Sequence, residues 1–268
     1  MAAIRSSRAF LLAAFLTGCS PETEREAADF DPAAFNPKPE CESRSFEGSL
    51  FTACKAVSGQ DEIRLAWRGP DGRALRSLPA LEAALGEESK RVRFAMNAGM
   101  YDEAGAPIGL YVAKGEESAP LNRRGGEGNF HLLPNGVFSV DRQGRFAVTP
   151  AARFRKKVPK PLWATQSGPM LVIDGELHPK FDHDGESRLI RNGVGARDPR
   201  TAWFVISEEG VSFGRFARFF RDALGCKNAL YLDGSISSLW DRGSGRQDPH
   251  DGLGPMLIVL KPASAQRP

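Results

Sequence analysis

The sequence predicts an α+β fold, a single domain on a mostly antiparallel or mixed β-sheet with a few packed helices. Short apolar segments between turns rich in glycine and proline dominate the chain. Two segments have helical periodicity, and strands and helices do not alternate as in a parallel βαβ sheet. With 41% hydrophobic residues among 268, the chain can bury the core of one large domain. The net charge of +3 is spread along the chain, which argues against a nucleic-acid-binding face.

The N-terminal segment is predicted to be a lipoprotein signal peptide. Arg5 and Arg8 precede an apolar run that is too short to anchor the chain across a bilayer. The sequence LTGC follows and ends at Cys19, in the order basic residues, apolar run, lipobox. Residues 1–18 would then be removed and Cys19 lipidated. A simple cleaved secretory signal and a buried helix are the alternatives.

A disordered tether is predicted over residues 19–40, because this segment is acidic, proline-rich and without periodicity. The folded domain would then occupy 41–268. Ser20 stands where an aspartate would favour the inner membrane, so the outer membrane is favoured. We therefore expect an exported protein, on the periplasmic side of the bacterial cell envelope, that touches the membrane only through its lipid.

The remaining cysteines are interpreted from the compartment. Export places the chain in an oxidising environment, where Cys41 and Cys54 are suited to a disulfide that closes a short loop. Cys226 is then expected to be a free buried cysteine, since no nucleophile motif surrounds it.

The two helices follow from periodicity and capping. In 77–90, apolar residues recur at helical spacing behind Ser77, which is suited to the N-cap, and Pro79 stands early in the segment. In 214–225, three phenylalanines form one apolar face and Gly225 is suited to the C-cap. The first helix is expected to pack on the sheet.

Strands are predicted where apolar residues alternate or run together between turn residues. Those in 49–57 and 61–69 are expected to pair with each other, 131–148 to form a meander, and 201–213 a hairpin. Residues 156–161 are expected to be a basic connector. Further strands are expected within 91–101, 108–115, 162–177, 228–232 and 255–262.

Four of these strands have polar residues and glycines at one of their ends. Glycine lets a ligand approach the backbone, amides and hydroxyls suit sugar hydroxyls, and arginines suit phosphate or carboxylate. Each signal alone fits an ordinary turn or a solvated charge, and it is their joint occurrence that predicts a site. The candidate residues are Asn97 and Gly99, then Gln166, Ser167 and Gly168, then Arg191 and Arg200, and finally Asp233, Gly234, Ser237 and Ser238.

Six segments carry a family resemblance, in chain order over roughly residues 45–260. They are NAGMY, GNFHLLPNGVF, ATQSGPMLVIDG, RNGVG, RTA and NALYLDGSISSLW. As a set they resemble the motif series of the phosphodiester glycosidases, the family of the mannose 6-phosphate uncovering enzyme, and they are most similar to its bacterial, exopolysaccharide-related branch. Family members carry glycines where Ser235 and Ile236 stand, which would change the substrate geometry at this loop.

The resemblance implies hydrolysis of a sugar-1-phosphodiester to free sugar and a phosphomonoester, on envelope or exopolysaccharide glycans. Asp233 would act at the sugar end and Arg200 would bind the leaving phosphate, with Arg191 as the second candidate. Asn97, Gln166 and Ser167 would bind sugar or phosphate oxygens. Ser237 and Ser238 would orient Asp233, and Gly99, Gly168 and Gly234 would permit the turns.

A non-catalytic envelope lipoprotein that binds polysaccharide, or assists its assembly, is the alternative function. No cofactor is expected to be required. Asp233 or Asp182 could hold Ca²⁺ or Mg²⁺ through oxygen ligands, and Glu127 could supply a second carboxylate. The loop with His178, Asp182, His183 and Asp184 matches no standard zinc spacing, so a solvated loop is favoured. The sequence leaves the oligomeric state open.

Overall fold

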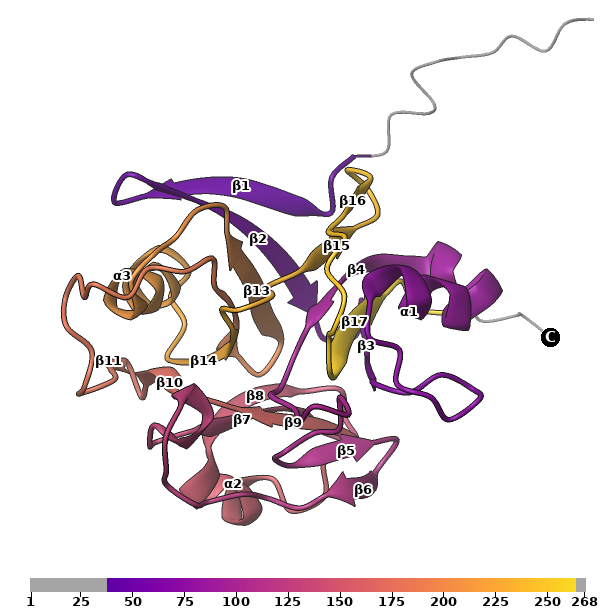
Figure 1. The fold of residues 1–268 in the computed structure, drawn as a ribbon, viewed down its shortest axis with the longest axis horizontal. Coiled ribbons are helices and arrows are strands. Elements are labelled where there is room, and N and C mark those ends of the chain that lie inside the picture. Colours follow the sequence, from indigo (N-terminus) through magenta and orange to yellow (C-terminus); the bar gives the residue numbers. More distant parts are fainter. Residues whose placement is uncertain (1–37, 264–268) are drawn as a thin grey trace, which may run out of the picture. The chain divides into compact units, whose positions relative to one another are not determined.

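The computed structural model of the protein describes residues 38–263. The predicted signal peptide, Cys19 and most of the tether lie outside the described residues. Within 38–263 the strands pair antiparallel in three sheets, so that the α+β prediction is confirmed and the fold is mostly β (Figure 1). Within the same residues, no helix has the length and apolar character needed to cross a bilayer.

The first sheet has seven strands in the order β1-β2-β13-β12-β14-β10-β11. It contains the hairpin of β1 and β2 and the strand that ends in the candidate aspartate. The strands are β1 (Cys41–Phe46), β2 (Ser49–Val57), β10 (Met170–Ile173), β11 (Glu176–Leu177), β12 (Asn192–Asp198), β13 (Thr201–Ser207) and β14 (Asn228–Asp233).

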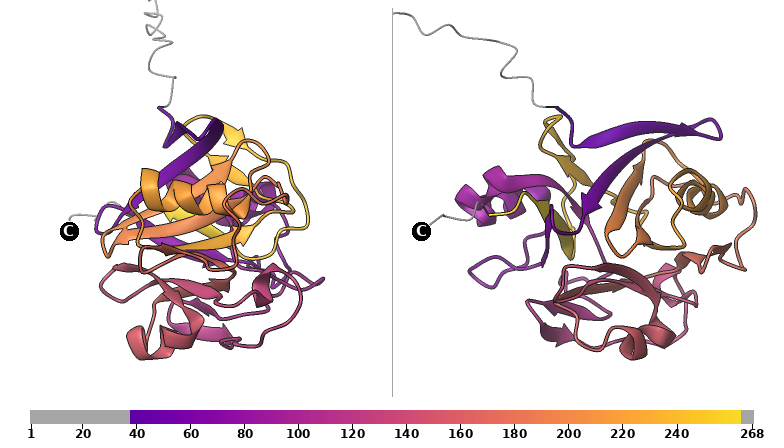
Figure 2. Two further views of the ribbon diagram at one scale, coloured as in Figure 1. Left: turned by 90° about the vertical axis from the view of Figure 1, so that its left-hand side faces the viewer. Right: turned by 180° about the vertical axis from the view of Figure 1, so that it is seen from behind.

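The second and third sheets have five strands each, in the orders β16-β15-β4-β17-β3 and β6-β5-β9-β7-β8. The second contains β3 (Glu62–Ala66), β4 (Val92–Asn97), β15 (Leu239–Asp241), β16 (Arg246–Gln247) and β17 (Met256–Leu260). The third contains β5 (Tyr111–Ala113), β6 (Glu116–Ala119), β7 (Gly136–Val140), β8 (Phe146–Pro150) and β9 (Trp163–Ser167), and forms a layer of its own in each view (Figure 2).

One α-helix packs on each sheet through apolar side chains. α1 (Leu78–Leu85) begins after the predicted N-cap Ser77, whose hydroxyl accepts from the Ala80 N–H, and it packs on the second sheet. α3 (Phe213–Arg218) covers the first sheet and continues into a π-helical turn, η4 (Phe219–Ala223). Two 3-10 segments, η2 (Gly86–Arg91) and η3 (Asn129–His131), complete the helical structure of residues 38–263.

α2 (Ala151–Lys157) packs on the third sheet through Phe154 and overlaps the segment expected to be a connector. Its N-cap position is Pro150, which makes no side-chain capping bond, so the usual start signal is missing. Burial of Phe154 holds this short helix in place, which local propensity alone does not predict.

Two predicted pairings are wrong. β2 pairs with β1 and β13, whereas β3 pairs with β17, so the first two predicted strands lie in different sheets. β13 forms its hairpin with β12, and not with residues 208–213. The reason is that Ser212 is the N-cap of α3, so the segment after β13 leads into a helix.

The core joins all three sheets through side chains on alternate positions of the strands. Phe204 of the first sheet lies with its ring centroid 5.5 Å from that of Phe94 in the second sheet and 5.5 Å from that of Phe138 in the third. In β14, Leu230 and Leu232 belong to this shared core, whereas Tyr231 faces α3. This alternation predicts that Asp233 lies on the same side of the strand as Tyr231.

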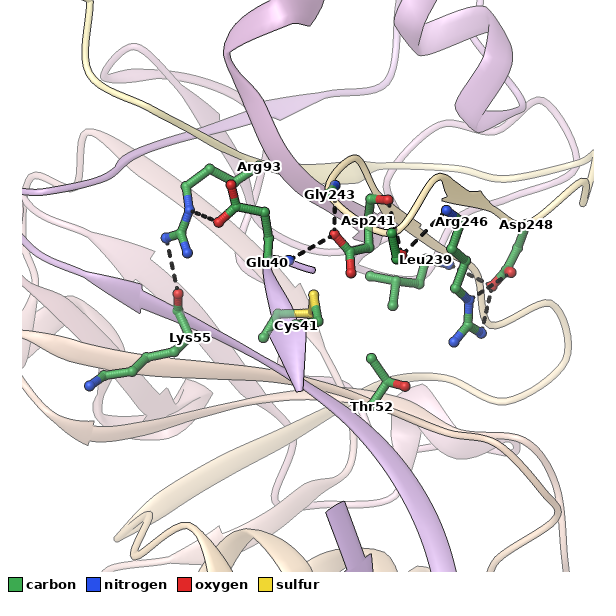
Figure 3. The surroundings of a disulfide bond; sticks show 12 residues. Glu40, Cys41, Thr52, Lys55, Arg93, Leu239, Asp241, Gly243, Arg246 and Asp248 are labelled. Carbon is green, nitrogen blue, oxygen red and sulfur yellow. Dashed lines mark hydrogen bonds and ion pairs between the residues drawn. A yellow bond between two sulfur atoms is a disulfide. The ribbon is translucent and has the colours of Figure 1, made fainter. Parts of the chain in front are cut away.

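The first described residues are bonded to the first two sheets (Figure 3). Cys41 and Cys54 form a disulfide between β1 and β2. Glu40 pairs with Arg93, and its N–H donates to Asp241 at 3.2 Å. Residues 38–40, which the sequence assigns to the tether, therefore contact the folded part. Cys226 is buried and free.

Candidate active site

The candidate site lies where strand ends from two sheets meet. Asp233 ends β14 and is paired across the first sheet with Asn192, the first residue of β12. Asn97 ends β4 in the second sheet. Residues 234–238 cross from β14 to β15, which pairs with β4. This crossing therefore brings three polar residues together that are far apart in the sequence.

Three N–H groups hold the carboxylate of Asp233. Oδ1 accepts from the backbone N–H groups of Gly234 and Ser235, the latter at 2.7 Å. Oδ2 accepts from the amide nitrogen of Asn97 at 3.0 Å. A carboxylate offers about four acceptor positions, so Oδ2 retains one for a ligand or a water molecule. Asp233 is half-buried, which leaves it partly accessible.

The amide of Asn97 is oriented by its neighbours, and only 1% of the residue is exposed. Its Oδ1 accepts from the backbone N–H of Ser238 and from Nδ2 of Asn192, both at 2.8 Å. Because the Ser238 N–H can only donate, the oxygen must face it, and the nitrogen must face Asp233. The second and first sheets thus fix one donor toward the carboxylate.

Ser237 and Ser238 act on the site through the backbone. The Ser237 hydroxyl donates to the carbonyl of Ile190 at 3.0 Å and lies 3.1 Å from that of Asp233, which joins the loop to the start of β12. The Ser238 hydroxyl lies 2.9 Å from the carbonyl of Ile236 and 2.9 Å from Nδ1 of His250. When that hydroxyl donates to the carbonyl, Nδ1 of His250 is the donor to the hydroxyl oxygen, and Nε2 of this exposed residue keeps the free lone pair.

Two tyrosines, each with an arginine over its ring, are near enough to Asp233 for its charge to act on them. The guanidinium of Arg76 lies 5.5 Å from the ring centroid of Tyr101, and that of Arg191 lies 5.6 Å from the ring centroid of Tyr231. Burial, with a smaller contribution from the charge of Asp233, raises the pKa of each phenol to about 12. Both phenols therefore keep their protons near neutral pH and are donors beside the carboxylate.

Arg191 is enclosed, with 0% of the residue exposed. Its Nε donates to the carbonyl of Val211 at 2.8 Å, and its guanidinium lies 3.7 Å from the Phe213 ring centroid. Burial lowers the pKa of this guanidinium. With no exposed surface, Arg191 supports Tyr231 and Gly234 from behind, and it does not face the solvent from which a phosphate would bind.

Arg200 lies away from this cluster. It is exposed in the turn between β12 and β13, at the opposite end of β12 from Asn192. The six residue steps from Asn192 to Asp198 span roughly 20 Å. A phosphoryl group bonded to a sugar at Asp233 is out of reach of Arg200, because the hairpin points this arginine the other way.

Gln166 and Ser167 have buried side chains that hold neighbouring backbone. Oε1 of Gln166 accepts from the N–H groups of Leu110 and Asn122, each at 2.9 Å. The Ser167 hydroxyl donates to the carbonyl of Leu232, directly before Asp233, at 3.1 Å. The third sheet therefore contributes by positioning the end of β14. Gly99 and Gly168 lie in close contact with this layer, where added Cβ atoms would overlap Gln166 and Asn135.

The side chain of Ile236 packs against the apolar cluster between α1 and the second sheet, and Ser235 is exposed. At these two positions the family resemblance leads us to expect glycines, but one side chain is packed and the other faces solvent. Ile236 contributes to the core beside the site.

The loop with His178 to Asp184 is separate from the site. His178 is buried, its Nε2 lies 3.2 Å from the carbonyl of Leu133, and burial lowers its pKa. Asp184 pairs with Arg188 and Arg215. Among residues 38–263, no group of three or more His, Cys, Asp or Glu side chains is arranged to hold a metal ion.

Sequence reasoning missed Arg76, Tyr101, Tyr231 and His250 as parts of one site, and it noted Asn192 beside Arg191 without giving it a role. The tyrosines lie in or just after apolar segments and have the pattern of core residues, and Arg76 and His250 have no local motif. The only signal available was proximity to quoted motifs, since Tyr101 follows NAGM and Asn192 lies in RNGVG.

Comparisons with known proteins place the chain in a family. The family model described as phosphodiester glycosidase matches residues 90–259. The Escherichia coli (strain K12) protein YigE, described as uncharacterized, is 37% identical over 198 residues, which are 73% of this chain and 76% of that protein.

Two solved structures share the fold. The zebrafish N-acetylglucosamine-1-phosphodiester alpha-N-acetylglucosaminidase catalytic domain, auto-inhibited by its pro-peptide, superposes with a TM-score of 0.56 at 15% identity, over 84% of this chain and 83% of that one. A hypothetical protein from Synechocystis superposes with a TM-score of 0.54 at 14% identity, over 84% and 62% of the two chains. The family model's span contains Asn97, Asn192 and Asp233, and the chain belongs to the phosphodiester glycosidase family.

Proposed function

We propose that this protein hydrolyses a sugar-1-phosphodiester by breaking the bond between the anomeric carbon and the phosphate oxygen. Water supplies the oxygen that stays on the sugar, and the phosphate leaves as a phosphomonoester. Membership of a family of glycosidases that act on phosphodiesters supports the reaction class. The observation that carries the proposal is the Asp233 carboxylate, held by three N–H donors and near enough to two protonated tyrosines for its charge to act on both.

Asp233 is assigned to the sugar end of the substrate. Its charge stabilises the oxocarbenium-like carbon as the bond to phosphate breaks. The free acceptor position on Oδ2 takes a proton from the attacking water. A phosphodiester is a weak base, so the leaving oxygen needs little help from a general acid. One carboxylate with fixed donors around it is enough for this reaction.

Glycans of the envelope or exopolysaccharide are the proposed substrate class, and export with lipidation at Cys19 is the proposed setting. The support is the order of signal features in residues 1–19. Replacing Cys19 with alanine should release the protein from the membrane fraction. If this variant remains in the membrane fraction, the lipid anchor is rejected while the hydrolase proposal stands.

The test of the reaction is hydrolysis of UDP-N-acetylglucosamine and of other sugar-1-phosphodiesters in water enriched in oxygen-18. The heavy oxygen should appear in the sugar and not in the phosphate. Its appearance in the phosphate would identify a phosphodiesterase that breaks the P–O bond. Binding without sugar release would favour the polysaccharide-binding alternative.

Asp233→Asn should abolish sugar release. Asp71→Asn is the matched control, because Asp71 is also an aspartate whose Oδ1 accepts from a following backbone N–H, at 3.0 Å from Arg73, in an exposed turn. Full activity of Asp233→Asn would remove Asp233 from the mechanism. Circular dichroism and urea unfolding show whether each variant is folded.

A further inference from the structure

We propose that Arg76 is the residue that binds the phosphoryl group of the substrate, with Tyr101 as its partner. This inference rests on the proposed function. It gives to Arg76 the phosphate-binding role that the sequence predicts for Arg200. Arg76 precedes residues 90–259, the span that the family model matches. The assignment therefore concerns a part of this chain that the family match does not cover.

The position of Arg76 is defined by three neighbouring segments. Its guanidinium lies over Tyr101, and its Nη1 packs against Gly105. A Cβ atom added at Gly252 would lie 3.7 Å from its Nη2 and 4.0 Å from Cδ1 of Ile236. Arg76 and Ile236, which is three residues after Asp233, thus both border Gly252.

The positive charge of Arg76 has no counter-charge from the described protein. Within residues 38–263, its side chain makes no hydrogen bond and no ion pair, and Nη1 is a buried nitrogen without an acceptor. By contrast, Arg93, Arg218 and Arg246 each pair with a carboxylate. A desolvated cation without an anion is costly, so an anionic ligand would remove that cost.

The other arginine with an unpartnered Nη1 beside the site is Arg191. Arg191 is fully buried, whereas Arg76 is half-buried. A ligand that arrives from solvent can therefore contact Arg76 and not Arg191. The two similar Arg–Tyr pairs thus have different roles, since one supports the site from inside and the other borders it.

The backbone at Arg76 is held in an unfavourable conformation. Its φ of +63° lies in the left-handed region, which costs a residue with a side chain about 1 kcal/mol or more. The carbonyl of Arg76 accepts from the N–H of Leu253 at 2.8 Å, and Ser77 begins the cap of α1. The fold therefore maintains a strained residue whose side chain is directed to Tyr101, as expected for a functional position.

Asp233 and Arg76 both act on Tyr101. Besides burial, the negative charge of Asp233 raises the pKa of the Tyr101 phenol, while the positive charge of Arg76 lowers it. The phenol is thus near enough to both a carboxylate and a guanidinium for each charge to act on it. A sugar-1-phosphodiester has the complementary pair of charges, because its carbon that becomes positive would lie at Asp233 and its anionic phosphoryl group at Arg76. Tyr101, which stays protonated, can donate to an oxygen between them.

The test is direct observation of phosphate binding by NMR of the protein with labelled tyrosine rings. The chain has three tyrosines, and Tyr111 lies buried in the third sheet as an internal control. The probe is methyl phosphate, which has the phosphoryl group and no sugar. Addition of methyl phosphate should shift the Tyr101 signal and leave the Tyr111 signal in place.

Arg76→Met keeps the aliphatic stem, removes the charge and should weaken methyl phosphate binding by about 10- to 100-fold, as expected for a charge-assisted hydrogen bond. Arg76→Lys should retain part of the affinity. Arg73→Met is the matched control, because Arg73 lies in the same loop with 89% of its side chain exposed. It should bind methyl phosphate like the wild-type protein.

Equal affinity of Arg76→Met and Arg73→Met would overturn this inference, even if the wild-type protein releases sugar. A wild-type protein in which methyl phosphate does not shift Tyr101 would overturn it as well. If Arg76→Met loses binding and the wild-type protein releases no sugar, the phosphate site stands and the proposed hydrolysis fails. In an active enzyme, Arg76→Met should also lower kcat/KM for UDP-N-acetylglucosamine by about 100-fold.

Discussion

The side-chain amide of Asn97 donates to Oδ2 of Asp233 at 3.0 Å, although 136 residues separate them in the chain. This bond joins the end of β4 to the end of β14 and therefore joins two sheets at a polar contact. The bond occupies one acceptor position on Oδ2, and since two backbone N–H groups bind Oδ1, Oδ2 is the oxygen that keeps a free position. The activity of the site should accordingly depend on residues that never contact substrate.

Asn97→Ala should lower both stability and activity. The substitution leaves the buried N–H of Ser238 and Nδ2 of Asn192 without one acceptor each, at about 1–3 kcal/mol for an unsatisfied group. Urea unfolding measures the loss. Asn228→Ala, at the partly exposed start of β14, where Oδ1 accepts from the backbone N–H of Asp174, is the control and should cost less than Asn97→Ala. An unfolding free energy unchanged by Asn97→Ala would contradict the network.

Gly234→Ala should destabilise the site, and Tyr231→Phe should relieve part of that effect. A Cβ atom at Gly234 would overlap the hydroxyl oxygen of Tyr231, and it would approach Nη1 of Arg191 to 3.4 Å. Overpacking of this kind costs about 1–3 kcal/mol. Removing the hydroxyl frees the space, so the double variant should be more stable than Gly234→Ala. Strict additivity of the two effects would show that the overlap is not the cause.

Ser238→Ala and His250→Ala should affect kcat non-additively. The Ser238 hydroxyl lies 2.9 Å from Nδ1 of His250 and orients that ring. The reason is that Ser238 would act on proton transfer through His250. Once His250 is removed, the further loss of Ser238 should lower kcat less, because substitutions of residues in contact are not additive. A double-mutant cycle on kcat, together with the pH dependence of kcat, measures the coupling. Additive effects would separate His250 from the site chemistry.

The ion pair between Glu47 and Arg218 should make stability depend on pH in the acidic range. Hydrogen bonds from Arg218 hold the pKa of Glu47 below its usual value of 4.5. A folded-state pKa that is lowered adds stability above the unfolded-state pKa and loses it as pH falls through the folded-state pKa. The difference in urea midpoint between the wild-type protein and Glu47→Gln should be constant above about pH 5 and should shrink below it.

Glu103→Gln, in an exposed loop, is the control for this pH series. Its midpoint should follow that of the wild-type protein. A wild-type advantage over Glu47→Gln that persists at pH 2 would show that the carboxylate charge is not what joins the β1–β2 turn to α3.

Ile236→Gly, which introduces the glycine that the family resemblance leads us to expect here, should reduce stability and should not increase activity. The side chain packs against the cluster of α1 and the second sheet. Removal of a fully buried isoleucine side chain costs about 2–5 kcal/mol. The cost at Ile236 should lie at the low end of this range or below it, because the residue is only partly buried. Thermal unfolding and sugar release measure the two effects. A gain in activity at unchanged stability would mean that Ile236 obstructs the site.

Local signals in the sequence account for part of the fold. The helix after Ser77 and the alternation of apolar residues in β14 depend on contacts within a few residues, so periodicity and capping predict them. Strand pairing, in contrast, does not depend on contacts within a few residues. The separation of β3 from β2 and the hairpin between β12 and β13 depend on which apolar face each strand buries, and several pairings satisfy the same pattern.

The candidate site divides in the same way. By itself, the sequence determined that a carboxylate, an amide and glycines follow apolar strands, and it singled out Asp233 and Asn97, which the structure joins by a hydrogen bond. Only the tertiary structure decided which cations accompany them. The seven residues of β12 separate Arg200 from Asn192 and Asp233, burial encloses Arg191, and a strained turn before α1 brings Arg76 to Tyr101. Local patterns report residue types, whereas the direction of a side chain depends on sheet register and on contacts between distant segments.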